Sequence, residues 1–267
     1  MSGADVPAGR VVLGREAAVA TVLLEHPGRL NAITIAMWRA LENAFRGFSA
    51  DASLRCVVVR GAGGQFAAGA DIREFPQARA DIEGVTAYHR DVIAPALDAV
   101  GACMHPVVAA IEGVCVGGGL EIASRCDLRI AARGACFGAP INRLGFPMAP
   151  DEMRGLLDLA GHAATLEILL EGRVFDADEA MAKGLLTRVV DDEAFDEALQ
   201  GAVARIVAGA PLAARLNKRI AAQLRRAEPA SFSDAQWREF FSYAHSGDHR
   251  RGIQAFLDGQ DPVFTGD

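Results

Sequence analysis

Two hydrophobic patterns alternate along most of this chain, and their alternation limits the possible folds more than any other feature. Runs rich in β-branched residues predict short strands, and segments with helical spacing or helix start signals lie between and after them. The predicted strands are 11–13, 19–24, 56–60, 107–113 and 128–132. The predicted helices are 35–50, 85–101, 118–126, 153–170, 176–184 and 193–208. Strands that alternate with helices predict an α/β domain.

The pattern changes after about residue 191, where no further strand run occurs. Helical spacing continues instead, with Pro211 and Pro229 at the boundaries between segments. We therefore expect an α/β core over residues 1–192 and a C-terminal helical module over residues 193–267. The expected helices of this module are 193–208, 211–226, 233–244 and 246–258.

Composition and charge exclude several classes of protein. The 267 residues are 51% hydrophobic and 23% charged, which is enough apolar chain to bury a core without disulfides or a metal. The formal net charge is −7, so no basic surface indicates a nucleic acid or an anionic membrane as a partner. We expect neither kind of partner.

The cysteines and the apolar segments indicate the compartment. The five cysteines lie in apolar runs without a C-x-x-C spacing, which predicts buried thiols in a reducing compartment. The first ten residues lack the apolar segment of a secretory signal. The longest apolar stretch, 106–123, is interrupted by Glu112, Glu121 and three consecutive glycines, so we expect no membrane-spanning helix. The sequence predicts a cytoplasmic protein.

Familiar nucleotide, hydrolase and metal motifs do not match. The glycine run 117–119 lacks the lysine and the hydroxyl residue of a P-loop, and no G-x-S-x-G or H-E-x-x-H segment occurs. His245 and His249 are four residues apart on a predicted helix, but no carboxylate clearly completes a metal site. We expect these two histidines on a solvated helix face, and no bound metal.

Two glycine-bearing segments, 61–72 and 112–121, each follow a predicted strand. Glycine lets another group approach the backbone closely, and an exposed N–H at a strand end or a helix start donates readily to an oxyanion. Glu121 lies in the first turn of the helix that starts near Gly118, where its side chain leans back over the helix start. An acid–base group beside an anion site is one interpretation. Turn formation by the glycines, and pairing of Glu121 with Arg125, are the structural alternatives.

These segments resemble the crotonase family of enoyl-CoA hydratases and isomerases. The resemblance is carried by FAAGADI at 66–72, by GGGLE at 117–121 and by the segment that ends with Cys126 and Asp127. It extends over most of the chain through RLNA at 29–32, AxxxGLxxxV at 180–189 and HSGDHRRGIQAF at 245–256. It implies a fold of repeated ββα units followed by a C-terminal helical module.

The resemblance also implies roles for individual residues. In the family, two main-chain N–H groups bind the thioester oxygen of an acyl-CoA, and the matching positions are Ala68 and Gly118, with Glu121 as the acid–base residue. The main chain around Ala67, Asp71 and Ile72 would hold the adenine end of coenzyme A, and Arg29 would meet its phosphates. Coenzyme A would enter as part of the substrate, and no cofactor would be bound permanently.

The chain departs from the family at one catalytic position. Hydratases of the family carry a second glutamate just after the proline of segment 136–145, where this chain has Ile141. Relatives that isomerise dienes or dehalogenate aromatic thioesters carry an aspartate where this chain has Ala149. Asp151 and Glu152 lie close by, but an acidic pair before helical residues is first a capping signal, and we favour that role.

The resulting hypothesis is an acyl-CoA-processing enzyme that stabilises a thioester enolate, as an enoyl-CoA hydratase or isomerase. Thioester hydrolysis or C–C cleavage is an alternative, and so is an acyl-CoA binder without catalysis, because Ile141 replaces the second glutamate. The acyl chain cannot be inferred from the sequence. Members of the family form trimers or dimers of trimers, so we expect a homotrimer or a dimer of trimers.

Overall fold

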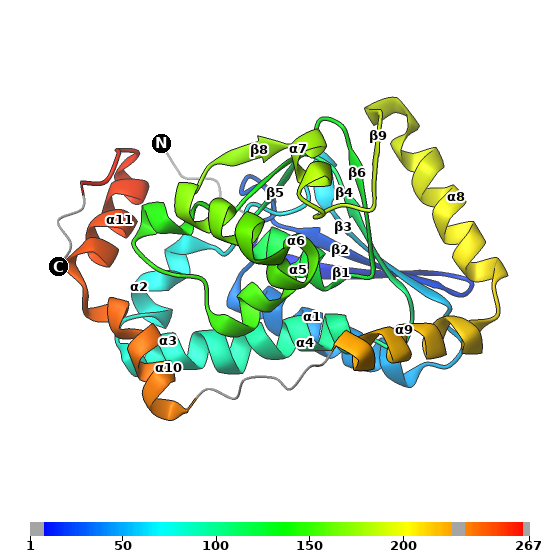
Figure 1. The fold of residues 1–267 in the computed structure, drawn as a ribbon, viewed down its shortest axis with the longest axis horizontal. Coiled ribbons are helices and arrows are strands. Elements are labelled where there is room, and N and C mark those ends of the chain that lie inside the picture. Colours follow the sequence, from blue (N-terminus) through cyan, green and yellow to red (C-terminus); the bar gives the residue numbers. More distant parts are fainter. Residues whose placement is uncertain (1–7, 226–232, 264–267) are drawn as a thin grey trace.

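The structure is a computed structural model that describes residues 8–225 and 233–263. A six-stranded sheet forms its centre within these residues (Figure 1). Neighbouring strands are parallel except β1 and β2, which form a hairpin. In spatial order the strands are β1 (Arg10–Glu16), β2 (Val19–Glu25), β3 (Cys56–Gly61), β4 (Val107–Ile111), β6 (Leu128–Ala132) and β9 (Arg188–Val190).

The middle strands of this sheet are apolar on both faces. Val107, Ala109 and Ile111 of β4 face the main core, and Val108 and Ala110 face a second cluster behind the sheet. This follows from the alternation of side chains along a strand, and burial on both faces is typical of parallel sheets. The main core lies against α1 (Ile35–Ala50), α4 (Ala94–Ala102) and α5 (Gly118–Arg125).

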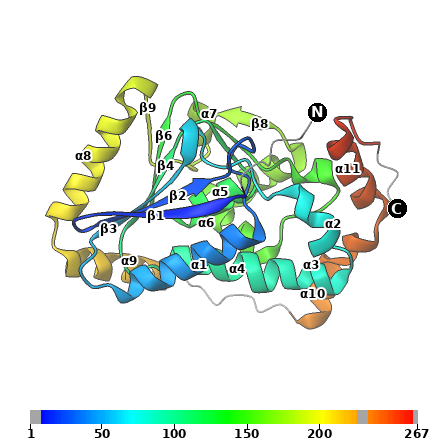
Figure 2. The ribbon, with the colours of Figure 1, turned by 180° about the vertical axis from the view of Figure 1, so that it is seen from behind.

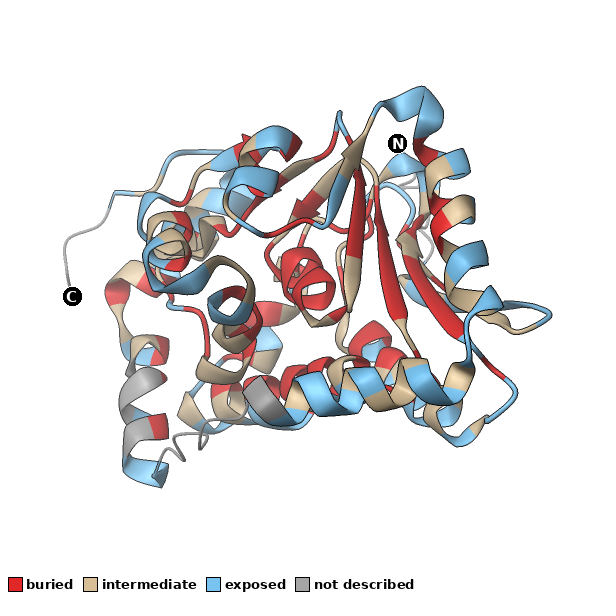
Figure 3. Ribbon diagram, turned by 45° about the vertical axis from the view of Figure 1, so that its right-hand side comes forward, coloured by how far each residue is buried: buried red, intermediate tan, exposed pale blue. Residues whose placement is uncertain are grey.

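A smaller, three-stranded sheet lies beside the first and completes two ββα repeats. It contains β5 (Val114–Val116), β7 (Cys136–Gly138) and β8 (Val174–Asp176). In each repeat a long strand, a short strand and a helix follow one another: β4, β5 and α5, then β6, β7 and α6 (Pro150–Glu171). Helix α5 is buried on nearly all sides at the centre of the molecule, as Figure 3 shows. Helix α7 (Ala177–Ala182) connects β8 to β9.

The C-terminal helices pack onto the core at three separate places (Figure 2). Helix α8 (Phe195–Ala208) covers the back of the main sheet through Phe195, Leu199 and Ala202. Helix α9 (Pro211–Arg225) lies beyond it. Near the other end of the molecule, α10 (Asp234–Phe240) and α11 (Gly247–Asp258) lie close to α2 (Phe75–Ala78) and α3 (Ile82–Ala87).

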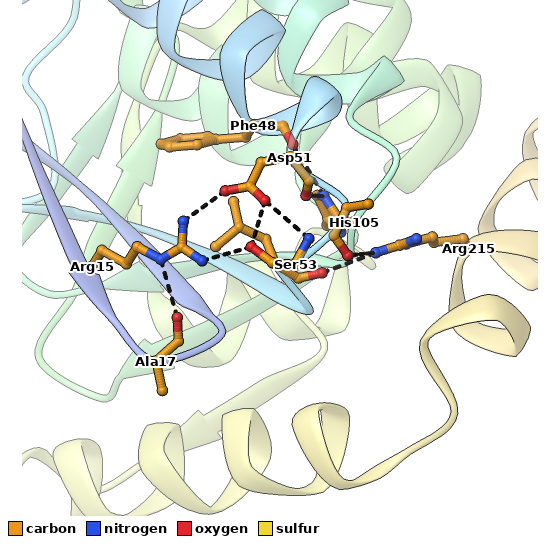
Figure 4. Close-up of polar contacts among 9 residues, drawn as sticks. Arg15, Ala17, Phe48, Asp51, Ser53, His105 and Arg215 are labelled. Carbon is orange, nitrogen blue, oxygen red and sulfur yellow. Dashed lines mark hydrogen bonds and ion pairs between the residues drawn. The ribbon is translucent and has the colours of Figure 1, made fainter.

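A polar cluster joins α9 to the loop after α1 (Figure 4). The Arg215 guanidinium donates to the backbone oxygens of Ala52 and Leu54, at 2.8 and 3.0 Å. On the other side of this loop, Arg15 of β1 pairs with Asp51 at 2.6 Å, and its guanidinium also donates to the Ser53 hydroxyl. The cluster therefore ties the loop after α1 to β1 and to α9, which are distant from each other in sequence.

The sequence predicted the long strands and most helices at these positions. The exceptions are short or composite elements. The predicted strand 107–113 is β4 followed by a turn, and β5, β7, β8 and β9 were not predicted. The predicted helix 85–101 comprises the end of α3, a π-helical segment over Tyr88–Ile93, and α4. None of the helices in residues 8–225 and 233–263 combines the length and the apolar character that crossing a bilayer requires.

Candidate active site

The two glycine-bearing segments come together beside the start of α5. Ala67 forms an isolated parallel bridge with Cys115 of β5, and Ala70 forms another with Ile33. In the second bridge, Ile33 bonds to the residues on either side of Ala70: its N–H donates to Gly69 O at 2.7 Å, and its oxygen accepts from Asp71 N at 2.9 Å. The N–H of Ala70 therefore points away from this bridge.

Two N–H groups without acceptors meet at this junction, and they belong to Ala70 and Gly118. Neither donates a hydrogen bond within the part of the chain that the structure describes. They are close together, because a methyl group built on Gly118 would lie 3.5 Å from the Ala70 nitrogen. Gly118 is the first residue of α5, where unpaired N–H groups and the helix dipole both favour negative charge. This pair can bind an oxyanion.

The prediction for Ala68 was therefore wrong as to the donor. Its N–H donates to Leu30 O at 2.9 Å and is not available to a substrate. Gly69, at φ 105°, turns the chain between Ala68 and Ala70 in a conformation that favours glycine. The free N–H consequently lies two residues later than predicted. The N–H of Gly118, the other predicted donor, makes no hydrogen bond to the described residues, and its role stays a prediction.

A cavity of about 320 Å³ opens next to these N–H groups. Its wall is mostly apolar, with a few polar groups from distant parts of the chain. The residues that line it include Ala70, Ile72, Arg79, Gly118, Glu121, Ile141 and Glu152. A largely apolar cavity with few convergent polar groups is the usual form of a small-molecule site.

Glu121 projects from the first turn of α5 into this cavity and is only 6% exposed. Its carboxyl makes no hydrogen bond to the described residues. Arg125, its predicted alternative partner, pairs instead with Asp98 of α4 at 2.8 Å. Burial raises the pKa of Glu121 well above its usual range, and the nearby Glu152 raises it further, whereas Arg79 lowers it. The protonated form of Glu121 is thereby favoured.

Glu152 is a second carboxyl group in the same cavity and is 4% exposed. Its Oε1 atom lies 2.5 Å from Nδ1 of the buried His89. The predicted capping role was wrong, because the residue at the start of α6 is Ala149 and no side chain caps it. Asp151, by contrast, lies toward the surface and pairs with Arg154 at 3.4 Å.

Arg79 brings a buried positive charge to the same wall. Its guanidinium carbon lies 3.6 Å from the ring centre of Phe75, 4.4 Å from that of Tyr88 and 4.6 Å from that of Phe146. These rings provide cation–π contacts that offset part of the loss of hydration. Nε and Nη1 have no hydrogen-bond partner among the described residues. Sequence reasoning missed Arg79, because nothing in its local pattern separates it from a surface arginine.

Ile141, the residue at which this chain departs from the family, lines the cavity wall. Ile141 lies in a short helical turn over Pro140–Leu144 and presents an apolar side chain where the family resemblance implies a glutamate. Any second acid–base group must therefore come from elsewhere in the wall.

The residues predicted to hold coenzyme A divide into three groups. Ala67 is fully buried and uses both backbone groups to pair with Val114 and Val116, so the prediction for Ala67 was wrong. Asp71 donates its N–H to Ile33, and its carboxylate binds Arg73 at 2.6 Å. Ile72 lines the cavity, and Arg29 is exposed in the turn after β2 but does not line the cavity. The roles of Ile72 and Arg29 stay predictions.

The two late histidines do not share a solvated face. His245 is exposed, but His249 is buried, and its Nδ1 lies 3.0 Å from Leu144 O. The prediction of a solvated face was therefore wrong for His249. Among the described residues, no group of three or more His, Cys, Asp or Glu side chains is arranged to hold a metal ion.

Comparison with known proteins places this geometry in a family. The sequence model of the enoyl-CoA hydratase/isomerase family matches residues 14–267. A probable enoyl-CoA hydratase of Rhizobium meliloti (strain 1021) is 32% identical over 243 residues, which cover 90% of this chain and 91% of that protein. The human mitochondrial Delta(3,5)-Delta(2,4)-dienoyl-CoA isomerase is 31% identical over 207 residues, which cover 74% of this chain and 63% of that protein.

Comparison with solved structures indicates the same family. The crystal structure of an enoyl-CoA hydratase/carnithine racemase from Magnetospirillum magneticum superposes with a TM-score of 0.80. It is 47% identical to this chain, and the match covers 98% of this chain and 97% of that one. The predicted crotonase fold and family are thus confirmed. The chain belongs to the enoyl-CoA hydratase/isomerase family, and it is an enzyme of the hydratase/isomerase type that processes acyl-CoA.

Proposed function

We propose that this enzyme acts on an enoyl-CoA thioester and stabilises the thioester enolate through the N–H groups of Ala70 and Gly118. The observation that carries the proposal is the pair of unpartnered N–H groups beside the buried carboxyl of Glu121, in one cavity. The names of the relatives, enoyl-CoA hydratase and dienoyl-CoA isomerase, support the substrate class.

The N–H pair lowers the energy of the charge that develops during the reaction. When the thioester carbonyl oxygen becomes an enolate oxygen, two fixed donors in a water-poor cavity stabilise it without reorganising. The positive end of α5 adds to this effect at Gly118. Loss of one such donor typically costs about 10²–10³ in kcat.

Glu121 delivers or removes the proton at the α-carbon. Because burial and the charge of Glu152 raise its pKa, the protonated form of its carboxyl is favoured. A protonated carboxyl next to an enolate-binding pair is suited to protonate the α-carbon. In the reverse direction the carboxylate takes that proton.

The wider assignments are proposed on the same basis. Arg29 would meet the phosphates of coenzyme A, and the main chain at Ile72 would lie along its path into the cavity. We propose a cytoplasmic enzyme of fatty acid metabolism with no permanently bound cofactor. We also propose a homotrimer or a dimer of trimers, which light scattering tests directly.

The test measures turnover of crotonyl-CoA and of a 3-enoyl-CoA by the wild type and by Glu121→Gln. We expect the variant to lose about 10²–10⁴ in rate, the usual contribution of a positioned acid–base group. Equal rates would remove Glu121 from the mechanism. Release of free CoA thiol would indicate hydrolysis instead, and saturable binding without turnover would indicate a binder.

A further inference from the structure

The cavity holds a second carboxyl group that the sequence analysis assigned to helix capping. Glu152 is 4% exposed, and its only hydrogen-bond partner among the described side chains is His89. Its second oxygen accepts no hydrogen bond from the described residues, and the side chain lines the same cavity as Glu121. A buried carboxyl with one oxygen left unpartnered toward a cavity is unfavourable for stability alone.

His89 contacts Glu152 and fixes its position. The imidazole is 2% exposed, and its ring stacks on Phe241 with centroids 5.2 Å apart. Its Nδ1 faces Glu152, and its Nε2 lies 3.3 Å from the Tyr243 hydroxyl. A neutral ring satisfies both contacts when Nδ1–H donates to the carboxylate and Nε2 accepts from Tyr243. Burial lowers the pKa of His89, although the charge of Glu152 opposes this, and the neutral form is thereby favoured.

The backbone around His89 is also unusual. His89 lies in the π-helical segment Tyr88–Ile93, between α3 and α4. Segments of π-helix are rare and occur often at functional sites. Here the π-helical segment places His89 against the first turn of α6, which carries Glu152.

We propose that Glu152, positioned by His89, is the second acid–base group of this active site and acts opposite Glu121. The inference rests on the proposed function, because it needs an acyl-CoA substrate in the same cavity. Glu152 would be a catalytic residue, and His89 and Tyr243 would be positioning residues. The site would then contain two carboxyl groups although position 141 is apolar.

The two carboxyl groups supply both proton transfers that the addition of water to the enoyl thioester requires. The carboxylate of Glu152 takes a proton from water as the water oxygen bonds to the β-carbon. The electron pair of the Cα=Cβ bond moves toward the thioester oxygen, which the N–H groups of Ala70 and Gly118 stabilise. Glu121 then gives its proton to the α-carbon, and the product is a 3-hydroxyacyl thioester. Exchange with solvent afterwards removes the proton from Glu152 and returns one to Glu121.

The charges around the site favour this division of roles. Glu121 has no hydrogen-bond donor among the described residues, and burial favours its protonated form, whereas Glu152 accepts the N–H of His89. The buried Arg79 balances one negative charge in the cavity. Groups whose environments hold them in different protonation states can serve as acid and base in one step. The other titratable or charged groups that face this pair or line the cavity are Tyr88, Arg143, Tyr243, His249 and Asp261.

The first test separates the two carboxyl groups by the reactions that each one supports. Exchange of the α-hydrogen of butyryl-CoA in D₂O needs the N–H pair and Glu121, whereas hydration of crotonyl-CoA also needs Glu152. We expect Glu152→Gln to lose about 10²–10⁴ in hydration. It should retain α-hydrogen exchange, with the pH profile of the exchange moved to lower pH because the charge of Glu152 no longer raises the pKa of Glu121. Asp151→Asn is the matched control, because it removes a carboxylate from the same helical turn but outside the cavity. It should keep both rates.

The second test addresses His89 through the pH dependence. In His89→Gln, Glu152 loses its imidazole donor, so the acidic limb of kcat/KM for hydration should move to higher pH. A purely structural role would lower Tm without moving this limb. This variant also keeps the inference testable if Glu152→Gln does not fold, which circular dichroism detects.

The outcomes distinguish the two proposals. Wild-type hydration by a folded Glu152→Gln variant would overturn the inference and leave the proposed function intact. The same holds for a wild type that shifts the double bond of a 3-enoyl-CoA but adds no water to crotonyl-CoA. A wild type that binds no acyl-CoA and exchanges no α-hydrogen would contradict the proposed function itself.

Discussion

Two polar clusters of this protein place carboxyl groups in opposite environments. Asp51, in the cluster that ties the loop after α1 to β1 and α9 (Figure 4), accepts hydrogen bonds from the Ser53 hydroxyl, the Ser53 backbone N–H and Arg15. These contacts lower the pKa of Asp51 to about 2. Glu121, in the cavity, has no hydrogen-bond donor among the described residues, and burial raises its pKa.

The difference lies in whether the protein itself satisfies the polar groups of the cluster. Every oxygen of the Asp51 carboxylate has a partner, so nothing is left for a ligand to satisfy. In the cavity, Glu121, Glu152 and Arg79 keep polar atoms without protein partners although all three are buried. Buried groups of this kind lower stability, and such groups concentrate at functional sites.

The largest effect that separates the two regions is expected from a single methyl group. In Gly118→Ala the new Cβ lies 3.5 Å from the Ala70 nitrogen and 3.0 Å from Trp38, so it crowds the two N–H groups that we propose as oxyanion donors. We expect kcat for crotonyl-CoA hydration to fall about 10²–10³, as for loss of one oxyanion donor. Gly47→Ala is the control, because no atom lies within 4 Å of its Cβ. Steady-state kinetics at equal folded fraction measures both, and an unchanged Gly118→Ala would disprove the N–H pair.

Replacement of Glu121 should raise the stability of the fold although it lowers the rate. Its pKa is higher in the folded than in the unfolded chain, so its contribution is present below the unfolded pKa and is lost as pH rises through the folded pKa. Glutamine carries no charge and avoids that loss. We expect Glu121→Gln to raise Tm by a few degrees, with a gain that grows as the pH rises above the ordinary pKa of a glutamate. Thermal melting measures it, and a gain independent of pH would contradict a raised pKa.

Sequence reasoning succeeded where a pattern extends over many residues. The strand runs of β2, β3 and β4 and the helical spacing of α1 and α8 are long enough for their periods to be recognised. The positions of Gly118 and Glu121 followed from one local event, the start of a helix after a glycine run. Short strands such as β5 and β7 have three residues each and carry no measurable period.

The remaining parts of the site depend on contacts between distant segments. The choice between Ala68 and Ala70 depends on the turn at Gly69 and on which N–H the segment around Leu30 accepts. Glu152 follows a proline in the first turn of a helix, and this pattern is the same for a capping carboxylate and for one turned inward. Only the position of His89, 63 residues earlier, distinguishes the two cases.

A smaller effect is expected at Arg79. Burial and the charge of Glu152 raise the pKa of Glu121, and the charge of Arg79 opposes them. Arg79→Met removes that charge and keeps most of the side-chain length, so the pKa of Glu121 should rise further. The alkaline limb of the kcat profile, which reports protonated Glu121, should then move to higher pH. Arg154→Met, on the outer side of α6, should leave the limb in place, and a matching shift there would point to a general charge effect.

The smallest effect is expected in the exposed cluster. The pKa of Asp51 is lowered to about 2, so its contribution to stability is present above the unfolded value and is lost as pH falls through about 2. The side chain is partly exposed, and solvent screens its pair with Arg15. Asp51→Asn should therefore lower the urea midpoint slightly at neutral pH, with a difference that shrinks toward pH 3 and below. Its kcat should equal that of the wild type, because the cluster does not line the cavity. The hydrogen-bond networks of the two clusters are separate, so we expect no coupling between them. Slower hydration of crotonyl-CoA by this variant at equal folded fraction would contradict that expectation.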